Sequence, residues 1–250
     1  MNRFFIYAKL KYIRQEIKVK LILNADDFGY TKEINRGIMH GMRNGIITST
    51  TVLTNCEIDP SDCEELKSIQ STGIGIHFNL TLEKPLTTGT SIQDNNGYFY
   101  DRKKLDFYKL NLTDVEHEFR AQMNRFIELF HQTPDHIDSH HSIHDHPIIL
   151  PITLKLMKEY NIPARRLSNV TFVSNFFGQN ATIHNLKEML IHHKNLECIE
   201  IMTHPGYSDD ILRSKSSYSD YRENELNILT SHEIKTFIEQ QGIELSYYGK

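Results

Sequence analysis

Short apolar runs alternate with segments of helical period along this chain after residue 18. The first run, Val19 to Leu23, predicts a buried strand. Further strands are expected at residues 50–54, 74–80, 135–139, 164–167, 197–202 and 243–248. Because helical segments fall between nearly every pair of these strands, the pattern indicates repeated βα units and disfavours a sandwich. We therefore expect an α/β fold with about seven parallel strands in one domain.

Residues that cap helices mark several of the helical segments. Thr31 precedes a helix that Gly45 is expected to end, and capping boxes that begin at Thr113 and Thr230 are expected to open two more helices. Helices are also expected at residues 61–70 and from Pro147 onward. Residues 82–112 and 205–222 lack a clear period and are expected to form long loops.

The composition is that of an ordinary globular domain. The 250 residues include 39% hydrophobic and 24% charged residues, and the mean hydropathy of -0.46 argues against membrane residence. A net charge of -4 provides no basic surface for nucleic acid. Three cysteines without a Cys-x-x-Cys spacing predict neither a disulfide framework nor a thiolate zinc site, so we expect a reducing compartment, the cytoplasm.

Residues 1–17 are expected to lie outside the domain, which would span residues 18–250. Their apolar patch, residues 4–8, is interrupted by Lys9, Lys11 and Arg14 before it reaches the length of a secretory or membrane-spanning segment. A basic amphipathic helix at a membrane surface is one alternative. We favour a peripheral extension, a partner-contacting helix or an upstream start codon over the membrane interpretation, so no membrane partner is expected.

Two adjacent carboxylates are the most informative chemical feature of the chain. Asp26 and Asp27 follow the first apolar run, and two like charges this close are costly unless a cation accounts for them. His77, His140 and His204 each fall at or just past the end of another expected strand. Because the carboxyl ends of the parallel strands of an α/β barrel share one face, all five side chains are expected to meet there. This pattern predicts a metal-dependent hydrolase.

A histidine-rich run, residues 136–146, requires separate consideration because such runs also bind metals adventitiously. If residues 135–139 are extended, Asp138 and His140 share a face with His136, whereas His141 points away. We favour His140 as a metal ligand, His144 as a residue near the substrate, and Asp138 as the partner that orients an imidazole. The choice among His140, His141 and His144 stays open at this point.

Five motifs resemble one known family, in the order seen in that family. They are NADDFG (24–29), TSTTVLTN (48–55), GIHFNLT (75–81), HIDSHHSIH (136–144) and HPGY (204–207). The chain is similar in these motifs to the YdjC-like carbohydrate deacetylases, the group that includes chitooligosaccharide deacetylases. The likeness covers roughly residues 19–249.

The resemblance implies a distorted (β/α) barrel that removes the acetyl group from N-acetylglucosamine units of small chito-oligosaccharides such as diacetylchitobiose. By motif position, it implies one divalent metal ion held by Asp27, His77 and His140, with Asp26 as catalytic base and His204 as general acid. It also implies a homodimer.

The identity of the metal depends on which argument is followed. The resemblance implies Mg²⁺, whereas two imidazoles and one carboxylate suit Zn²⁺ or another transition ion better. Near the substrate, a small N-acetylated sugar, aromatic rings such as Phe28 and Tyr207 would stack on pyranose faces beside His144.

Two other kinds of function remain open from the residues alone. A metal-dependent phosphoesterase or amidohydrolase acting on another substrate would use similar ligands, because barrels of this kind support many chemistries. A metal-binding or carbohydrate-binding module without turnover is the alternative outside enzymes, but it would not need Asp26 beside Asp27.

Overall fold

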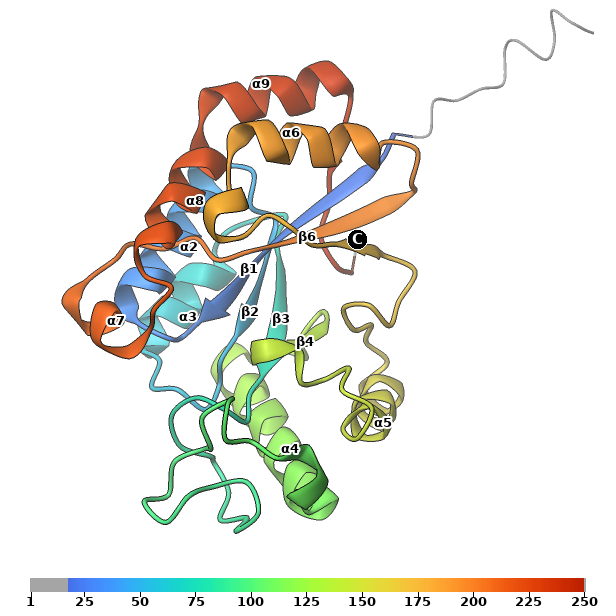
Figure 1. Cartoon of the computed structure of the whole chain (residues 1–250). Helices are drawn as coiled ribbons and strands as arrows, with labels where there is room; N and C mark the ends of the chain where they lie inside the picture. The colour runs from blue at the N-terminus through green and yellow to red at the C-terminus, as the bar shows by residue number, and fades with distance from the viewer. Residues whose placement is uncertain (1–17, 250) are drawn as a thin grey trace, which may run out of the picture.

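The computed structural model describes residues 18–249, and the predicted extension of residues 1–17 lies outside them. Seven strands form one sheet in which every ladder is parallel. The sheet order is β4-β3-β2-β1-β6-β5, and β7 pairs with β1 (Figure 1). The strand bounds are β1 Lys20–Phe28, β2 Ser49–Val52, β3 Gly73–Phe78, β4 Ile137–Ser139, β5 Thr171–Val173, β6 Cys198–Thr203 and β7 Glu244–Leu245.

Strand β1 lies at the centre of the sheet, between β2 and β6, and its apolar residues suit this buried position. From Leu21 to Phe28 every residue is buried, as expected for a strand covered on both faces. It pairs with β2 and β6 along its length, and with β7 only at Lys20 and Leu21. At one end of the sheet, β4 makes a single further bridge, from Ile137 to Ala164. The result is the α/β distorted barrel that the sequence and the resemblance predict.

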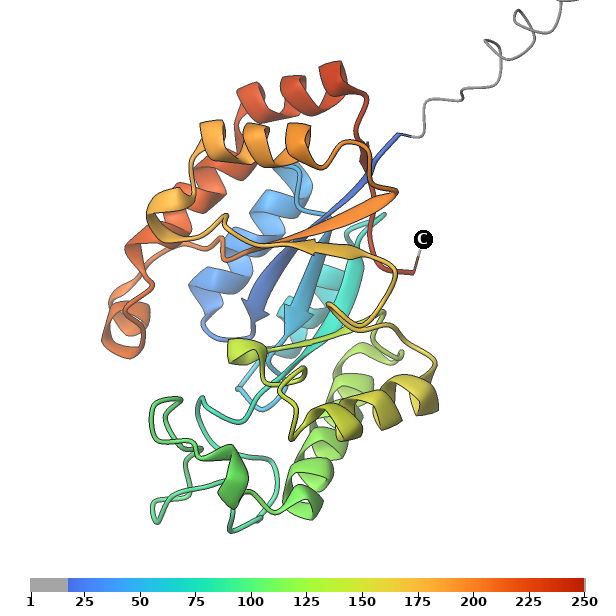
Figure 2. The same ribbon diagram turned by 45° about the vertical axis from the view of Figure 1, so that its right-hand side comes forward.

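Helices surround the curved sheet (Figures 1 and 2). They are α2 Lys32–Asn44, α3 Pro60–Lys67, α4 Leu112–Phe130, α5 Leu150–Tyr160, α6 Ile183–His192, α7 Asp210–Lys215, α8 Asp220–Thr230 and α9 His232–Gln241. Two views show α6 beside α9, and α4 beside α5 (Figures 1 and 2). Three short 3₁₀ turns complete the described part: η1 Phe107–Lys109, η2 His140–Ser142 and η3 Gly178–Asn180.

The predicted cap of α2 is confirmed, but the two capping boxes are wrong by one or two residues. The Thr31 hydroxyl accepts a hydrogen bond from the Ile34 N–H at 3.2 Å, and Gly45 ends the helix. However, α4 is capped by Asn111, and α9 is capped by Ser231. The Asn111 side chain accepts the N–H of Thr113, and the Ser231 side chain accepts the N–H of Ile234. Asn111 and Ser231 therefore cap these helices in place of Thr113 and Thr230.

Three other predicted segments differ from the structure. Residues 164–167 do not form a strand, and β5 instead lies at Thr171–Val173, where it pairs with β6. The helix expected from Pro147 begins at Leu150, because the backbone N–H of Ile149 first closes a turn onto the carbonyl of His146 at 2.8 Å. The expected loop 205–222 contains α7, which Asp209 caps through the N–H of Leu212 at 2.7 Å.

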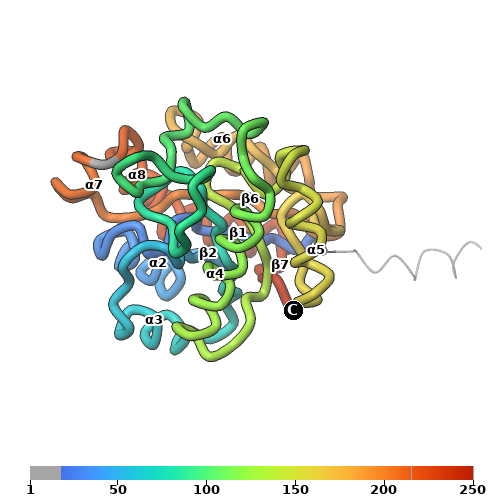
Figure 3. The backbone as a smooth tube through the Cα atoms, turned by 90° about the horizontal axis from the view of Figure 1, so that it is seen from below, coloured from blue at the N-terminus to red at the C-terminus, as the bar shows by residue number. Residues whose placement is uncertain are grey.

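The long loop expected at residues 82–112 is confirmed up to Asn111. This segment, in green, extends beyond the carboxyl ends of the central strands, and from below it lies in front of them (Figure 3). Buried Glu118 of α4 ties it down by accepting the N–H groups of Leu86 at 3.1 Å and Thr87 at 2.9 Å. The loop is therefore anchored to a helix at the same end of the barrel as the candidate residues.

Candidate metal and catalytic site

The end of β1 turns two neighbouring carboxylates in different directions. The register of β1 against β2 shifts between Ala25 and Phe28, and Asp27 has a φ of 75°. A non-glycine residue in this left-handed region costs roughly 1–3 kcal/mol, and such strain is typical of functional sites. The irregularity lets Asp26 and Asp27 contact different partners, although both are almost fully buried.

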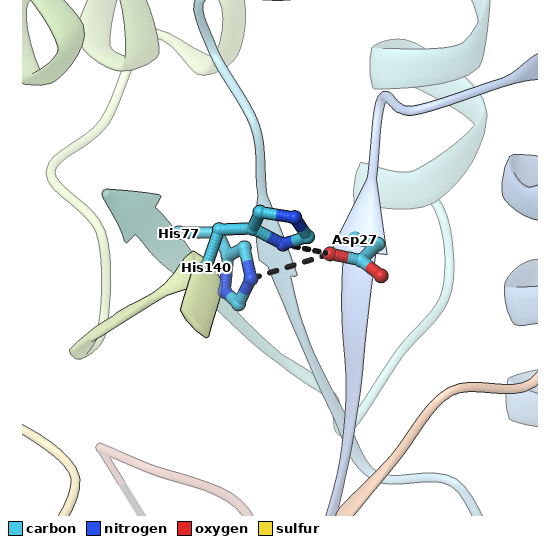
Figure 4. A group of neighbouring side chains, drawn as sticks. All are labelled: Asp27, His77 and His140. Atoms are coloured by element: carbon cyan, nitrogen blue, oxygen red, sulfur yellow. Dashed lines mark hydrogen bonds and ion pairs between the residues drawn. The ribbon is translucent and has the colours of Figure 1, made fainter. Parts of the chain in front are cut away.

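Asp27 faces two imidazoles that come from different strands (Figure 4). Its Oδ1 lies 3.3 Å from Nε2 of His77 near the end of β3 and 3.0 Å from Nδ1 of His140, directly after β4. Two ligand atoms at about 2.1 Å from one ion, seen at an angle near 100°, would be roughly 3.2 Å apart. The three side chains therefore fit a single divalent cation in both spacing and donor chemistry.

The far side of the His77 ring is held by Asp138. Nδ1 of His77 lies 2.6 Å from Oδ1 of Asp138, whose Oδ2 accepts the hydroxyl of Thr51 at 3.0 Å. This contact orients the ring so that Nε2 faces Asp27. Asp138 thus orients an imidazole, as predicted.

The proton affinity of His77 reflects this partner. Burial lowers the pKa of His77, but the charge and hydrogen bond of Asp138 outweigh it and raise the pKa to about 10. A cation bound at Nε2 would have to displace a proton from this ring.

The other carboxylate, Asp26, is held by a buried arginine. Arg165 donates from Nη1 to Oδ2 at 2.8 Å and from Nη2 to Oδ1 at 2.7 Å, and Asn24 also donates to Oδ1 at 2.8 Å. The same guanidinium contacts Asp138 at 2.8 Å and Glu200 at 2.7 Å. One cation thus compensates three carboxylates, and a bidentate pair of this kind fixes the orientation of Asp26.

His204, directly after β6, is held through its backbone. Its N–H donates to Oε2 of Glu225 at 2.6 Å, whereas Nδ1 of the ring is buried without a hydrogen-bond partner among residues 18–249. Burial lowers the pKa of His204 to about 4, against the opposing charges of Asp26 and Asp27. In the free protein the ring is therefore neutral at neutral pH.

An aromatic group surrounds this histidine. The ring of His204 meets Phe177 and Tyr218 edge to face, at centroid distances of 5.4 and 5.5 Å. Phe177 stacks on Tyr218 at 4.2 Å and remains 46% exposed. Tyr218 donates its hydroxyl to Oε1 of Glu225 and accepts the N–H of Gly178 at 2.8 Å.

A second buried arginine contacts the candidate metal ligand. Arg222, in the first turn of α8, donates from Nη2 to Oδ2 of Asp27 at 2.6 Å. Burial would raise the pKa of Asp27, but the charges of His140 and Arg222 outweigh it and hold this pKa well below its usual range. The carboxylate is therefore ionised at neutral pH.

Comparison with known proteins decides the family. The sequence matches the YdjC-like protein family over residues 20–240. The chain belongs to the YdjC-like family. The sequence-based resemblance is thereby confirmed.

Two relatives show how far the similarity extends. A carbohydrate deacetylase of Brevibacillus brevis is 37% identical over 248 residues, which cover 93% of this YdjC-like chain and 99% of the relative. A chitooligosaccharide deacetylase of Yersinia enterocolitica is 35% identical over 250 residues, with 92% and 98% covered.

Solved structures support the fold of this YdjC-like chain. One is the crystal structure of a protein from Enterococcus faecalis V583 that is named as a cellobiose-phosphate cleavage protein. Its TM-score is 0.86 at 32% identity, and the match covers 92% of this chain and 98% of the Enterococcus chain. The peptidoglycan deacetylase PdaC of Bacillus subtilis has a TM-score of 0.52 at 11% identity, with 92% and 88% covered, and shows likeness of fold alone.

The contacts described for the residues predicted to lie near the substrate are with protein atoms. Phe28 is fully buried in the hydrophobic core. The ring nitrogens of buried His144 lie 2.6 Å from the Ser139 hydroxyl and 3.1 Å from the Arg165 carbonyl, so both have protein partners. Tyr207 is half-buried and packs near α2. Protein atoms therefore enclose the rings of both Phe28 and His144.

His141 contacts the ring of His140, at a centroid distance of 4.0 Å, but it is not one of the three residues whose ligand atoms converge. Its Nδ1 lies 2.9 Å from the hydroxyl of Thr81, and its backbone φ of 60° turns the chain after His140. The structure therefore favours His140 within the run, as the alternation of side chains predicted.

The sequence did not identify Arg165, Arg222 or Phe177 as parts of the site, because no pattern around them marks a buried charge or a ring beside the site. The described helices include none that is both long and apolar enough to cross a membrane.

Proposed function

We propose that this protein is a metal-dependent carbohydrate deacetylase that removes the acetyl group from N-acetylglucosamine units of small chito-oligosaccharides such as diacetylchitobiose. The observation that carries the proposal is the convergence of Asp27, His77 and His140, with Asp26 next to the ligand group. The names of the Brevibacillus and Yersinia relatives support the substrate class.

The ligand group would hold one divalent cation. Bound there, the cation would polarise the acetyl carbonyl and lower the pKa of a water molecule. Two imidazole nitrogens and one carboxylate oxygen suit Zn²⁺ or another transition ion better than Mg²⁺, which prefers oxygen ligands. Metal analysis of the purified protein distinguishes Zn²⁺ from the Mg²⁺ that family resemblance implies.

The remaining groups divide the proton transfers. Asp26 takes a proton from water, and the resulting hydroxide attacks the acetyl carbon. Cleavage of the C–N bond then releases acetate, while His204 delivers a proton to the departing nitrogen. Since burial keeps the His204 ring neutral beforehand, its protonated form has to be favoured by the negative charge that develops on the tetrahedral intermediate. The proton that His204 delivers is the one that Asp26 removed from water, passed on to the ring as the tetrahedral intermediate forms. Asp26 and His204 therefore return to their starting forms when acetate and the amine leave.

The test is acetate release from diacetylchitobiose by the purified protein, with and without chelator and after addition of single metals. We expect chelator to abolish release and one metal to restore it. The His77→Ala and His140→Ala variants should lose metal binding and activity together. Chelator-resistant activity, or no acetate from any N-acetylated sugar, would contradict the proposal.

Three controls cover the alternatives. A phosphate ester and a non-sugar amide test the competing hydrolase reactions. Cellobiose phosphate tests the reaction in the name of the Enterococcus neighbour. We also propose that residues 18–250 form a single catalytic domain and that the protein is cytoplasmic. We further propose that it is a homodimer, which light scattering checks.

A further inference from the structure

We infer that Arg222 is a positioning residue that restricts Asp27 to binding a metal ion through one oxygen. The inference rests on the proposed metal site but concerns a residue outside its ligand group. It assigns different tasks to the two oxygens of a single carboxylate.

The two oxygens of Asp27 have separate partners. Oδ1 faces the imidazoles of His77 and His140 at 3.3 and 3.0 Å. Oδ2 accepts Nη2 of Arg222 at 2.6 Å, the length of a strong charge-assisted hydrogen bond. The carboxylate therefore presents Oδ1 to the other two ligands while a cation already occupies Oδ2.

The guanidinium is itself held in place. Arg222 is only 2% exposed, and its Nε donates to the carbonyl of Tyr218 at 3.0 Å. Its charge also lies over the rings of Tyr30 and Tyr218, at 6.0 and 5.8 Å. Nη1 is buried without a hydrogen-bond partner within residues 18–249. Burying a donor in this way is costly, so stability alone is a poor explanation for the arginine.

Coordination chemistry explains what the contact would achieve. Carboxylates bind cations through one or both oxygens. A second oxygen of Asp27 would use a coordination position that a catalytic ion must keep open for water or substrate. The guanidinium prevents this, both by occupying Oδ2 and by repelling a cation on that side.

The neighbouring carboxylate shows the opposite arrangement. Arg165 donates to both oxygens of Asp26, at 2.7 and 2.8 Å. Two arginines thus distinguish two adjacent aspartates: one is engaged on both oxygens, and the other on one. This difference favours Asp27 over Asp26 as the carboxylate that offers an oxygen to a metal, although Asp26, His77 and Asp138 also lie close together.

The experiment measures coordination directly. Cobalt(II) is bound to the wild type, to Arg222→Met and to the control Arg213→Met, whose side chain is 50% exposed and pairs with acidic residues away from the ligand group. X-ray absorption then counts the oxygen neighbours, and visible absorption reports the coordination number. We expect one additional oxygen neighbour in Arg222→Met alone, with turnover at saturating metal reduced about 10- to 100-fold.

Each outcome has a defined meaning. Unchanged coordination in a folded Arg222→Met protein overturns the inference, even if the wild type deacetylates normally. If Asp27 binds the metal through one oxygen but the protein releases no acetate, the inference stands and the proposed function is wrong. If Arg222→Met does not fold, the metal-loaded wild type decides, because two Asp27 oxygens on the ion overturn the inference and one supports it.

Discussion

Asp26 and Asp27 are neighbours in sequence, but their contacts predict different consequences of losing a charge. In Asp26→Asn, the side-chain oxygen can still accept from Arg165, so metal affinity should stay close to that of the wild type. The amide cannot take up a proton from water, so turnover should fall by about 10² to 10⁴. Calorimetric metal titration and acetate release measure the two quantities separately.

The matched control is Asp27→Asn, which should lose metal affinity and turnover together. Full activity in Asp26→Asn would show that another group is the base. A large loss of metal affinity in Asp26→Asn would show that the two carboxylates do not have separate tasks.

Phe177 is an exposed ring in contact with His204, the proposed proton donor. One of its faces covers Tyr218, and the ring remains 46% exposed. Stacking on a pyranose would contribute on the order of 1 kcal/mol, so Phe177→Ala should raise KM for diacetylchitobiose roughly 3- to 10-fold with little change in kcat. Steady-state kinetics test this, and Tyr108→Ala, at a ring 86% exposed, is the control. Equal KM values for Phe177→Ala and the wild type would exclude the contact.

Some single residues of the site followed from the sequence, and others did not. Asp27, His77 and His140 were predictable because each ends or follows an apolar strand, and strand ends meet in a barrel. Arg165 and Arg222 were not, because a sequence-based analysis treats an arginine as exposed until its buried partner is known. Their partners, Asp26 and Asp27, lie 139 and 195 residues away along the chain.

At the scale of one element, α8 supports two sides of the site. Arg222 contacts the candidate ligand Asp27, and Glu225, one turn later, accepts the backbone N–H of His204. Burial raises the pKa of Glu225 from 4.5 to about 7. The folded protein therefore favours the protonated carboxyl, in contrast to the usual behaviour of a surface glutamate.

The raised pKa of Glu225 predicts how the free energy of unfolding of the protein changes with pH. The contribution of Glu225 is fully present below its unfolded pKa and is lost as pH rises through about 7. The loss approaches roughly 3 kcal/mol by about pH 8. In Glu225→Gln this titration is absent, so the stability of the wild type relative to the variant should fall between about pH 5 and 8. Denaturant unfolding across that range is the measurement, and parallel curves for the two proteins would contradict it.

The elements themselves show where sequence patterns are sufficient. Thr31 and Gly45 marked α2 correctly because polar caps and an apolar stripe agree there. The strand expected at 164–167 failed because its apolar residues are too few to determine a strand, and pairing with β6 instead selected Thr171–Val173. Edge elements of this sheet depend on tertiary pairing, whereas β1 was predictable from its own residues.

At the scale of the whole molecule, the parallel sheet brings the site together. The ligands come from β1, β3 and the turn after β4. His77 lies 50 residues after Asp27 in the sequence, and His140 lies 63 residues after His77. A cation shared by these segments would bind the folded chain far better than the unfolded chain. Metal binding should therefore stabilise the complete fold and not only the local site.

Removing the metal is expected to lower the melting temperature of the whole protein. At a free metal concentration of about 100 times Kd, the stabilisation is roughly 2.7 kcal/mol, which for a chain of this size corresponds to about 5–10 °C. Because the ion competes with a proton on His77, whose pKa is raised to about 10, the shift should be larger at about pH 8 than at about pH 6. Thermal unfolding with metal and with chelator measures it, and His140→Ala should show no shift. A metal-dependent shift of the same size in His140→Ala would mean that the stabilising ion binds elsewhere on the molecule.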